Sequence, residues 1–185
     1  MALRPEASED DQKEALISTI ENAEQVINLA DAIMDVAAAG AGTIHLLREP
    51  VALALLLEKV VDIYAYSAED KNITLHIEAR EGVIDADSIR MQQALANLVD
   101  NAVKYSPSGG AVTLAARVLE QSVLVTVEDS GSGIPEADLN HIWTRHFRSD
   151  RSRSMPGMGL GLSLVKAIVE AHAGIITIKS TVGSG

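Results

Sequence analysis

Apolar residues recur at alternating spacings of four and three along residues 12–39. The positions are Leu16, Ile20, Ala23, Ile27, Ala30, Met34 and Ala37. Such a seam is typical of a long helix whose apolar stripe packs against another helix, within one chain or in a dimer. The alternative is a helix that packs on its own domain, but the regular spacing favours pairing. The Gly-Ala-Gly segment at residues 40–42 ends this helix and marks a boundary.

Helical and strand patterns then alternate along the rest of the chain. A helical period covers residues 51–70, 87–104, 135–143 and 160–172. Strand-like patterns cover residues 43–47, 72–79, 83–85, 112–118, 123–128 and 174–179, with turns at 49–50 and 107–110. This order predicts an α+β fold: a two-layer α/β sandwich, with a mixed sheet and helices on one face, preceded by the long N-terminal helix.

Composition narrows the possible functions. Hydrophobic residues make up 47% of the 185 residues but aromatic residues only 3%, so the core must be built from Leu, Ile, Val and Ala. The formal net charge of -11 disfavours a nucleic-acid partner. The absence of cysteine excludes disulfides and thiolate chemistry. No apolar run is long enough to span a bilayer, which favours a cytoplasmic location, with any membrane anchor of the parent protein outside this chain.

One predicted helix carries a polar face formed by Asn97, Asn101 and Lys104, at spacings of four and three. An amide oxygen can ligate a hard cation without adding charge, and a lysine can contact a phosphate. By itself the pattern is equally typical of a solvated helix face.

Two glycine-rich loops supply further candidates. Residues 129–133 follow a predicted strand, and Asp129 could accept a hydrogen bond from an adenine amino group. Residues 157–161 run directly into a helix, whose first N–H groups favour a phosphate. The spacing of these glycines differs from that of a P-loop or a dinucleotide-binding fingerprint.

In this order, residues 97–105, 129–133, 157–161 and 183–185 resemble the N box and the glycine boxes of sensor histidine kinases. Their ATP-binding domain is shared with type II topoisomerases, heat-shock chaperones and mismatch-repair proteins. The resemblance implies a catalytic domain over residues 43–185, with its C-terminal strand truncated. Residues 1–42 resemble the second helix of the dimerisation hairpin, which would be incomplete here.

The resemblance also implies ATP and Mg²⁺ as cofactors and assigns roles to residues. Asn97, Asn101 and Lys104 would be the catalytic residues, with Asn101 as the Mg²⁺ ligand, Asn97 in support and Lys104 on a phosphate. Asp129 would bind the adenine amino group, and Tyr105 would flank the base. The remaining nucleotide-binding positions would be Gly131, Gly133, Ile134, Arg148, Gly157, Met158, Gly159, Leu160, Gly161 and Leu162.

The same resemblance favours a kinase over a hydrolase. Hydrolytic relatives carry a glutamate where this chain has Asn97, and an amide cannot act as a general base. The implied reaction transfers the γ-phosphoryl group of ATP to a histidine on a dimerisation helix, for onward transfer to a response regulator. None of the histidines stands in the acceptor context, so the acceptor would lie outside this chain, in the same or a second kinase chain of a homodimer. They are His45, His76, His141, His146 and His172. The alternative is a nucleotide-binding regulatory or scaffold module without phosphotransfer.

Overall fold

The computed structural model describes residues 44–120, 122–149 and 159–185. The predicted N-terminal helix therefore lies outside the described residues, as do Gly157 and Met158 of the second glycine loop. Within the described part of the chain, no helix is both long and apolar enough to cross a membrane.

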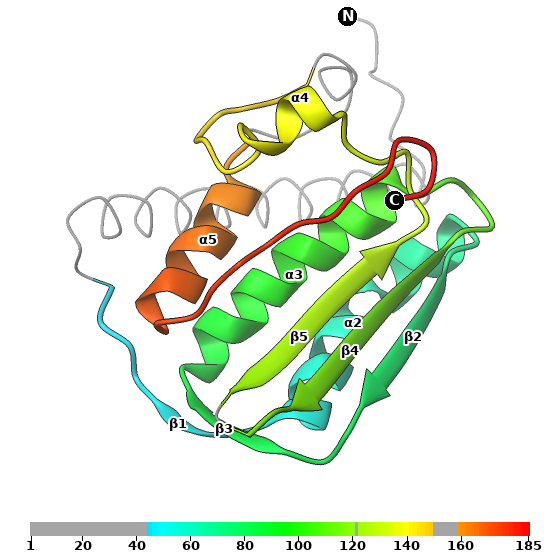
Figure 1. Ribbon diagram of the computed structural model, residues 1–185. Helices are drawn as coiled ribbons and strands as arrows, with labels where there is room; N and C mark the ends of the chain where they lie inside the picture. Colours follow the sequence, from blue (N-terminus) through cyan, green and yellow to red (C-terminus); the bar gives the residue numbers. More distant parts are fainter. Residues whose placement is uncertain (1–43, 121, 150–158) are drawn as a thin grey trace, which may run out of the picture.

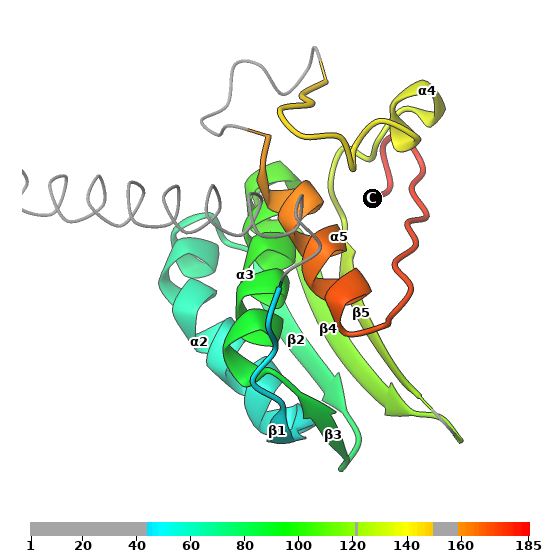
Figure 2. The ribbon, with the colours of Figure 1, turned by 90° about the vertical axis from the view of Figure 1, so that its left-hand side faces the viewer.

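A three-stranded mixed sheet forms one layer of the molecule. Its strands are β2 (Thr74–Ala79), β4 (Ala111–Val118) and β5 (Val123–Asp129), in the order β2-β4-β5. Strands β2 and β4 are parallel, whereas β4 and β5 form the predicted antiparallel hairpin. Helices α2 (Leu53–Asp70), α3 (Ser88–Tyr105) and α5 (Gly161–Ala171) cover one face of this sheet (Figures 1 and 2). The predicted mixed sheet with helices on one face is confirmed.

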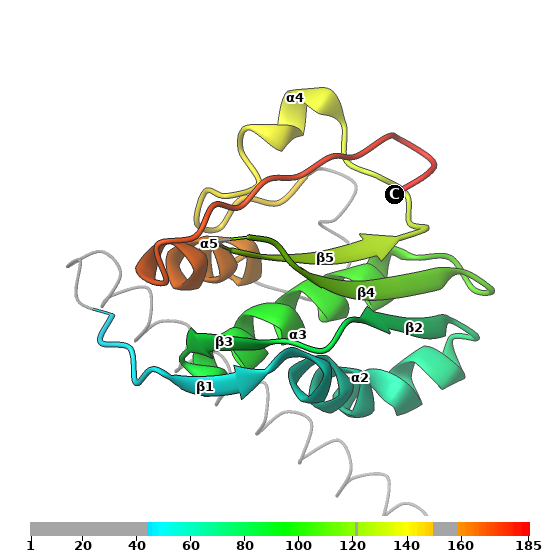
Figure 3. The same ribbon diagram turned by 60° about the horizontal axis from the view of Figure 1, so that its bottom comes forward.

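A second, two-stranded sheet corrects one prediction. It pairs β1 (Glu49–Ala52) with β3 (Val83–Ala86) in antiparallel orientation, and it lies beside the start of α2 (Figure 3). The strand predicted at residues 43–47 is wrong, as is the turn at residues 49–50. Pro50 pairs with Asp85 in this small sheet, where a residue without an N–H group is tolerated because β1, among the residues that the structure describes, has one neighbouring strand.

Aliphatic side chains fill the interior, as the composition predicts. The main cluster lies between the helices and the sheet, and its fully buried members include Leu53, Leu57, Val60, Val99, Val112 and Leu114. A second cluster joins α3 to α5 through Ala94, Leu160, Leu164, Val165 and Ile168. Helix α5 therefore packs mainly on α3.

Helix α3 is held at both ends by side chains. The Asp87 carboxylate accepts a hydrogen bond from the Arg90 N–H at 3.0 Å and so caps the N-terminus. At the other end, Nζ of Lys71 donates to the carbonyls of Val103 at 2.8 Å and Lys104 at 2.7 Å. A cation on these carbonyls also complements the helix dipole. The helix that carries the candidate site is thus fixed along its length.

The segment after α5 differs from its prediction. The alternation at residues 174–179 predicts a strand, but the structure shows no strand pairing for this segment among the described residues. Ile175 is 91% exposed, whereas Ile176 packs against the α3–α5 cluster. The short helix α4 (Glu136–Leu139), followed by turns, replaces the longer helix predicted at residues 135–143.

Candidate functional site

The polar face of α3 points away from the core. Asn97, Asn101 and Lys104 are each half-buried, whereas Val99 and Val103 on the other side are buried. Among the described residues, no hydrogen bond to the Asn101 side chain is found. An amide that is half-buried and has no such partner is available to a ligand.

Gly161, at the start of α5, lies directly against Asn97. A Cβ atom at Gly161 would lie 2.8 Å from Oδ1 of Asn97, too close for any residue larger than glycine without a shift of Asn97. The Asn97 amide is held in turn, because its Nδ2 donates to the Gln93 carbonyl at 2.9 Å. The start of α5 and the polar face of α3 therefore meet at this pair.

The loop at residues 129–133 contacts the end of α3. The Gly131 N–H donates to Oδ1 of Asp129 at 2.8 Å, and the Ser132 N–H donates to the Tyr105 carbonyl at 3.3 Å. A Cβ atom at Gly131 would lie 3.0 Å from the Tyr105 carbonyl oxygen. The φ of Gly133 is 66°, and a Cβ there would clash with the Thr181 carbonyl. Asp129 thus holds its own loop with one oxygen and keeps the other for a further partner.

The last residues of the chain close on this loop. The Gly183 N–H donates to the Ser132 carbonyl at 2.8 Å, and the Gly185 N–H donates to the Gly131 carbonyl at 3.0 Å. The Ile134 N–H donates to the Ser180 hydroxyl at 2.7 Å. Ser180 was not among the candidates from the sequence, because nothing in its neighbourhood distinguishes it from a surface serine.

A further backbone contact holds Gly159. The His146 N–H donates to the Gly159 carbonyl at 2.9 Å, and a Cβ at Gly159 would lie 2.7 Å from the Phe147 carbonyl oxygen. The φ of Gly159 is 69°, a conformation that favours glycine. Leu160 is buried in the α3–α5 cluster, and Leu162 is half-buried in the first turn of α5. In the described part of the second glycine loop, Gly159 is therefore held by residues 146–147, and Leu160 is held by the α3–α5 cluster.

Two cations influence each other beside the polar face. Burial lowers the pKa of Lys104, Asp100 opposes this shift, and the positive charge of Arg148 lowers the pKa further. Nζ of Lys104 also lies 5.6 Å from the centroid of the Tyr105 ring. An ammonium group that is costly to charge beside a guanidinium group is better accommodated when an anion binds.

Asp100, which precedes Asn101 in the chain, interacts electrostatically with groups on both α3 and α2. Burial raises the pKa of this carboxyl group, and Lys104 partly offsets the rise. On α2, burial and then the Asp100 charge raise the pKa of the Tyr64 hydroxyl. Asp100 thus acts on Lys104 of the polar face and on Tyr64 of α2, and Asn101 and Lys104 remain the candidates for ligand contact.

The described residues contain no group of three or more His, Asp or Glu side chains that could hold a metal ion. Mg²⁺ is commonly held by one or two protein groups, with waters and substrate phosphates completing its shell. The neutral amide oxygen of Asn101 suits this mode of binding.

A comparison with family models identifies the class of protein. Residues 86–185 match the family described as the histidine kinase-, DNA gyrase B- and HSP90-like ATPases. The match covers α3, β4, β5, α5 and all the candidate residues. The chain belongs to this family, and it contains the catalytic, ATP-binding domain of a two-component sensor histidine kinase.

Two sensor proteins are similar to this chain in sequence. The chain is 37% identical over 134 residues to the adaptive-response sensory kinase SasA of Synechocystis, covering 71% of this chain and 35% of that protein. It is 30% identical over 179 residues to the sensor protein SrrB of Staphylococcus aureus, covering 95% of this chain and 31% of that protein. The chain thus spans about a third of the length of these relatives.

Solved structures show the same relationship. The structure of full-length ShkA in complex with AMPPNP aligns with a TM-score of 0.80 and 25% identity, covering 97% of this chain and 38% of that one. The mycobacterial sensor histidine kinase MprB aligns with a TM-score of 0.62 and 30% identity, covering 69% of this chain and 81% of that one. MprB is a sensor histidine kinase, in agreement with the family match.

Proposed function

We propose that this chain binds ATP with Mg²⁺ on the polar face of α3. We further propose that the protein containing it transfers the γ-phosphoryl group to a histidine on a dimerisation helix, for onward transfer to a response regulator. In this proposal residues 43–185 form the catalytic domain, on the cytoplasmic side of any membrane, and residues 1–42 are the second helix of the dimerisation hairpin.

The observation that carries the proposal is the position of two glycine contacts on one helix. Gly161 lies against Asn97, and Gly131 lies against Tyr105. Eight residues separate the two contacts on α3, which corresponds to about 12 Å along the helix axis. An extended ligand with a base at one end and phosphates at the other fits this separation.

Each end offers matching chemistry. At the Tyr105 end, the second oxygen of Asp129 would accept a hydrogen bond from the adenine amino group, beside Gly131, Gly133 and Ile134. At the Asn97 end, the backbone at residues 157–162 would surround the phosphates. Lys104 and Arg148 would neutralise the phosphate charge, and Asn101 would hold Mg²⁺ against the phosphates.

These residues support phosphoryl transfer by positioning and by neutralising charge. An acceptor imidazole nitrogen would attack the γ-phosphorus, the bond to the β–γ bridging oxygen would break, and ADP would leave. Asn97 has no group that titrates, so it provides no general base to activate water. Transfer to a nucleophile from another helix is therefore favoured over hydrolysis.

A calorimetric titration of the chain with a non-hydrolysable ATP analogue, with and without Mg²⁺, tests the binding site. We expect binding that depends on Mg²⁺ and weakens at least tenfold in Asn101→Ala, since a lost ligand to a charged group costs about 1.5–3 kcal/mol. Asn140→Ala is the matched control, because Asn140 is exposed at the end of α4. Equal binding by the parent chain and Asn101→Ala would contradict the proposed site.

Phosphotransfer needs a second experiment. The chain is mixed with radiolabelled ATP and a supplied acceptor hairpin, and labelled hairpin is measured beside released phosphate. A kinase labels the hairpin and releases little phosphate. Nucleotide binding without labelling would favour the alternative, a regulatory or scaffold module, and sustained phosphate release would favour a hydrolase.

A further inference from the structure

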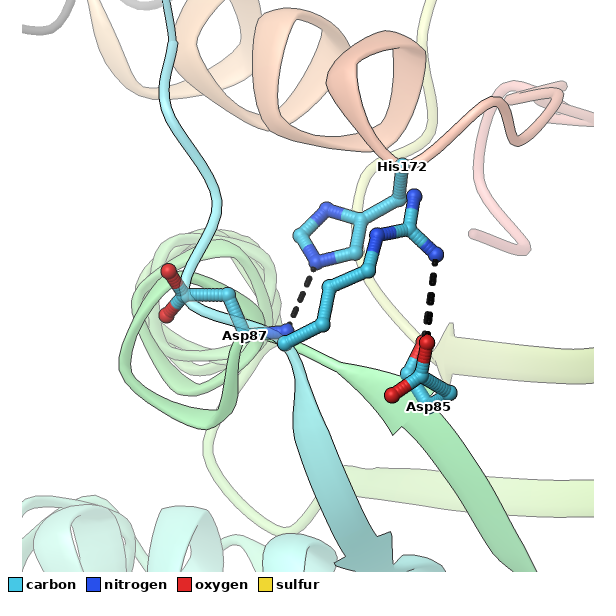
Figure 4. Close-up of polar contacts among 4 residues, drawn as sticks. Asp85, Asp87 and His172 are labelled. Atoms are coloured by element: carbon cyan, nitrogen blue, oxygen red, sulfur yellow. Dashed lines mark hydrogen bonds and ion pairs between the residues drawn. The ribbon is translucent and has the colours of Figure 1, made fainter.

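Three segments that are distant in the sequence meet at Asp87. The Asp87 backbone N–H donates to Nε2 of His172 at 3.0 Å, across 85 residues of chain (Figure 4). One carboxylate oxygen of Asp87 accepts the Arg90 N–H at 3.0 Å, and the other accepts the Leu47 N–H at 2.9 Å. Asp87 is buried. The start of α3, the end of α5 and the segment before β1 are thus joined at one residue.

This contact determines the state of the His172 ring. Because a backbone N–H can only donate, Nε2 of His172 must be the acceptor and carries no proton. Nδ1 lies 2.8 Å from the Ile168 carbonyl, so Nδ1 carries the proton and donates to that oxygen. The ring is therefore neutral, and a second proton would remove the acceptor for Asp87.

Helices α3 and α5 are antiparallel and touch at both ends of the shared stretch. Asp87 meets His172 at one end, and Asn97 meets Gly161 at the other. Ten residues separate the contacts on α3 and eleven separate them on α5, which corresponds to about 15 Å and about 16 Å. The aliphatic side chains between them pack without directional bonds. The hydrogen bond at Asp87 is directional, so it adds a specific constraint on the axial position of α5.

We propose that His172 and Asp87 are positioning residues for nucleotide binding. Their hydrogen bond sets the axial position of α5 on α3, and thereby the position of Gly161 beside Asn97. This inference rests on the proposed function, because it assumes that the start of α5 contacts the phosphates. The Leu47 N–H on the same carboxylate connects the segment before β1 to this alignment.

Charged groups lie on each of the elements that meet near His172. Asp87 and Arg90 lie at the start of α3, and Arg48 of the preceding segment contacts Asp85 of β3, with Nη1 3.3 Å from the carbonyl and 3.9 Å from the carboxylate. On α5 itself, Glu170 pairs with Lys166 at 3.7 Å. A second proton on the His172 ring would remove the acceptor of the Asp87 N–H, so an acidic shift of pH tests the bond directly.

Two substitutions separate the hydrogen bond from simple packing. His172→Gln keeps a side-chain acceptor that does not titrate, and His172→Phe keeps the ring but removes the acceptor. We measure the dissociation constant of a fluorescent ATP analogue with Mg²⁺ for the 185-residue chain at about pH 8 and about pH 5.5, on either side of the ordinary imidazole range. Glu170→Gln is the matched control, because it removes an exposed charge on the same helix.

At about pH 8 we expect three- to tenfold weaker binding for His172→Phe, and binding within about twofold of the parent for His172→Gln. The parent should lose affinity at the acidic pH, whereas His172→Gln should not. Equal affinity of His172→Phe and the parent, or an identical acid response of the parent and His172→Gln, would overturn the proposal. The acid response is measured on the parent and His172→Gln, so it does not depend on whether His172→Phe folds.

A readout without nucleotide distinguishes this proposal from the proposed function. The NMR signals of the Asp87 and Gly161 amides are followed in the free chain over the same pH range. If His172 positions α5, both signals shift together in the parent and stay constant in His172→Gln. A parent chain that fails to bind nucleotide but shows these shifts would refute the proposed function alone. Constant Gly161 signals in the parent would refute the positioning role.

Discussion

Gly161 at the start of α5 lies directly against Asn97 of α3. A Cβ atom at Gly161 would lie 2.8 Å from Oδ1 of Asn97, so the first turn of α5 can lie beside α3 only without a side chain there. The residue that contacts Gly161, Asn97, is the one from which the sequence predicts a kinase rather than a hydrolase. The distance between α3 and the start of α5 and the chemistry expected of Asn97 thus depend on the same pair of residues.

Gly161→Ala tests this contact. The added methyl group must displace the Asn97 amide, so we expect about tenfold weaker binding of an ATP analogue with less than about 1 kcal/mol lost from the free energy of unfolding, since alanine otherwise favours the helix. The measurements are calorimetric titration and urea unfolding.

Gly109→Ala is the matched control for this experiment. Gly109 has a φ of 82° and no atom near its missing side chain, so alanine there adds backbone strain away from the site. We expect it to reduce stability and leave binding unchanged. Weaker binding in both variants would assign the effect of Gly161→Ala to general destabilisation.

Asp129→Asn should separate the two oxygens of this side chain. The amide oxygen of asparagine can still accept the Gly131 N–H, which Asp129 accepts at 2.8 Å, so the loop is preserved. The other position becomes an NH₂ donor facing the adenine amino group, itself a donor. We expect at least tenfold weaker binding of ATP with little change in melting temperature, and an improved ratio of GTP to ATP binding in a competition assay. Unchanged preference for ATP would remove Asp129 from the base-binding role.

Lys104→Gln should affect binding and stability in opposite directions. The pKa of Lys104 is lowered chiefly by burial, so the folded protein holds this proton less firmly than the unfolded chain, and the charge opposes folding at neutral pH. The free energy of unfolding of the variant should equal or exceed that of the parent at about pH 7. Binding of the ATP analogue should weaken and depend less on salt.

Lys166→Gln provides the comparison for this variant. Lys166 is partly exposed on α5 and pairs with Glu170 at 3.7 Å. Lys166→Gln therefore removes the same charge as Lys104→Gln, but from the neighbouring helix. Its nucleotide affinity should match that of the parent. Equal loss of affinity in both variants would indicate a general effect of net charge.

Asp87 should contribute to stability in a way that acid removes. Burial alone would raise its pKa, but the N–H groups of Arg90 and Leu47 and the charge of Arg90 together lower it. A lowered folded pKa gives stability that is complete above the unfolded value of about 3.9 and is lost as the pH falls through the folded value. Urea unfolding should show an acid loss in the parent that is smaller in Asp87→Asn. Asp87→Ala should lose about 1–3 kcal/mol at neutral pH, since two N–H groups lose their acceptor.

Long elements with a clear period could be predicted from the sequence, and elements defined by distant partners could not. Both ends of helix α3 lie within one residue of those predicted, because Asp87 is a strong N-cap and the apolar stripe is continuous. Strand β1 was missed because Pro50 usually marks a turn, and only its pairing with Asp85 of β3 makes it a strand. The segment at residues 174–179 alternates like a strand yet leaves Ile175 exposed.

The candidate site likewise contains residues that could be predicted from the sequence and contacts that could not. Asn97, Asn101 and Lys104 follow from helical spacing, and the glycines follow from their loops. The contacts of Asp87 with His172 and of Ser180 with Ile134 join residues 85 and 46 positions apart, and no local pattern encodes them. These contacts result from the packing of α5 and of the last residues against the rest of the chain, which only the structure shows.

Helix α3 has two faces, and this has a consequence for how the domain can evolve. Val99 and Val103 face the core, whereas Asn97, Asn101 and Lys104 are half-buried on the other side. Selection for folding and selection for chemistry therefore act on different positions of one helix, in a repeat of 3.6 residues. A descendant gene could lose its polar positions one at a time and still encode a folded protein. Inactive copies that persist as partners of active ones are thus an accessible outcome of this architecture.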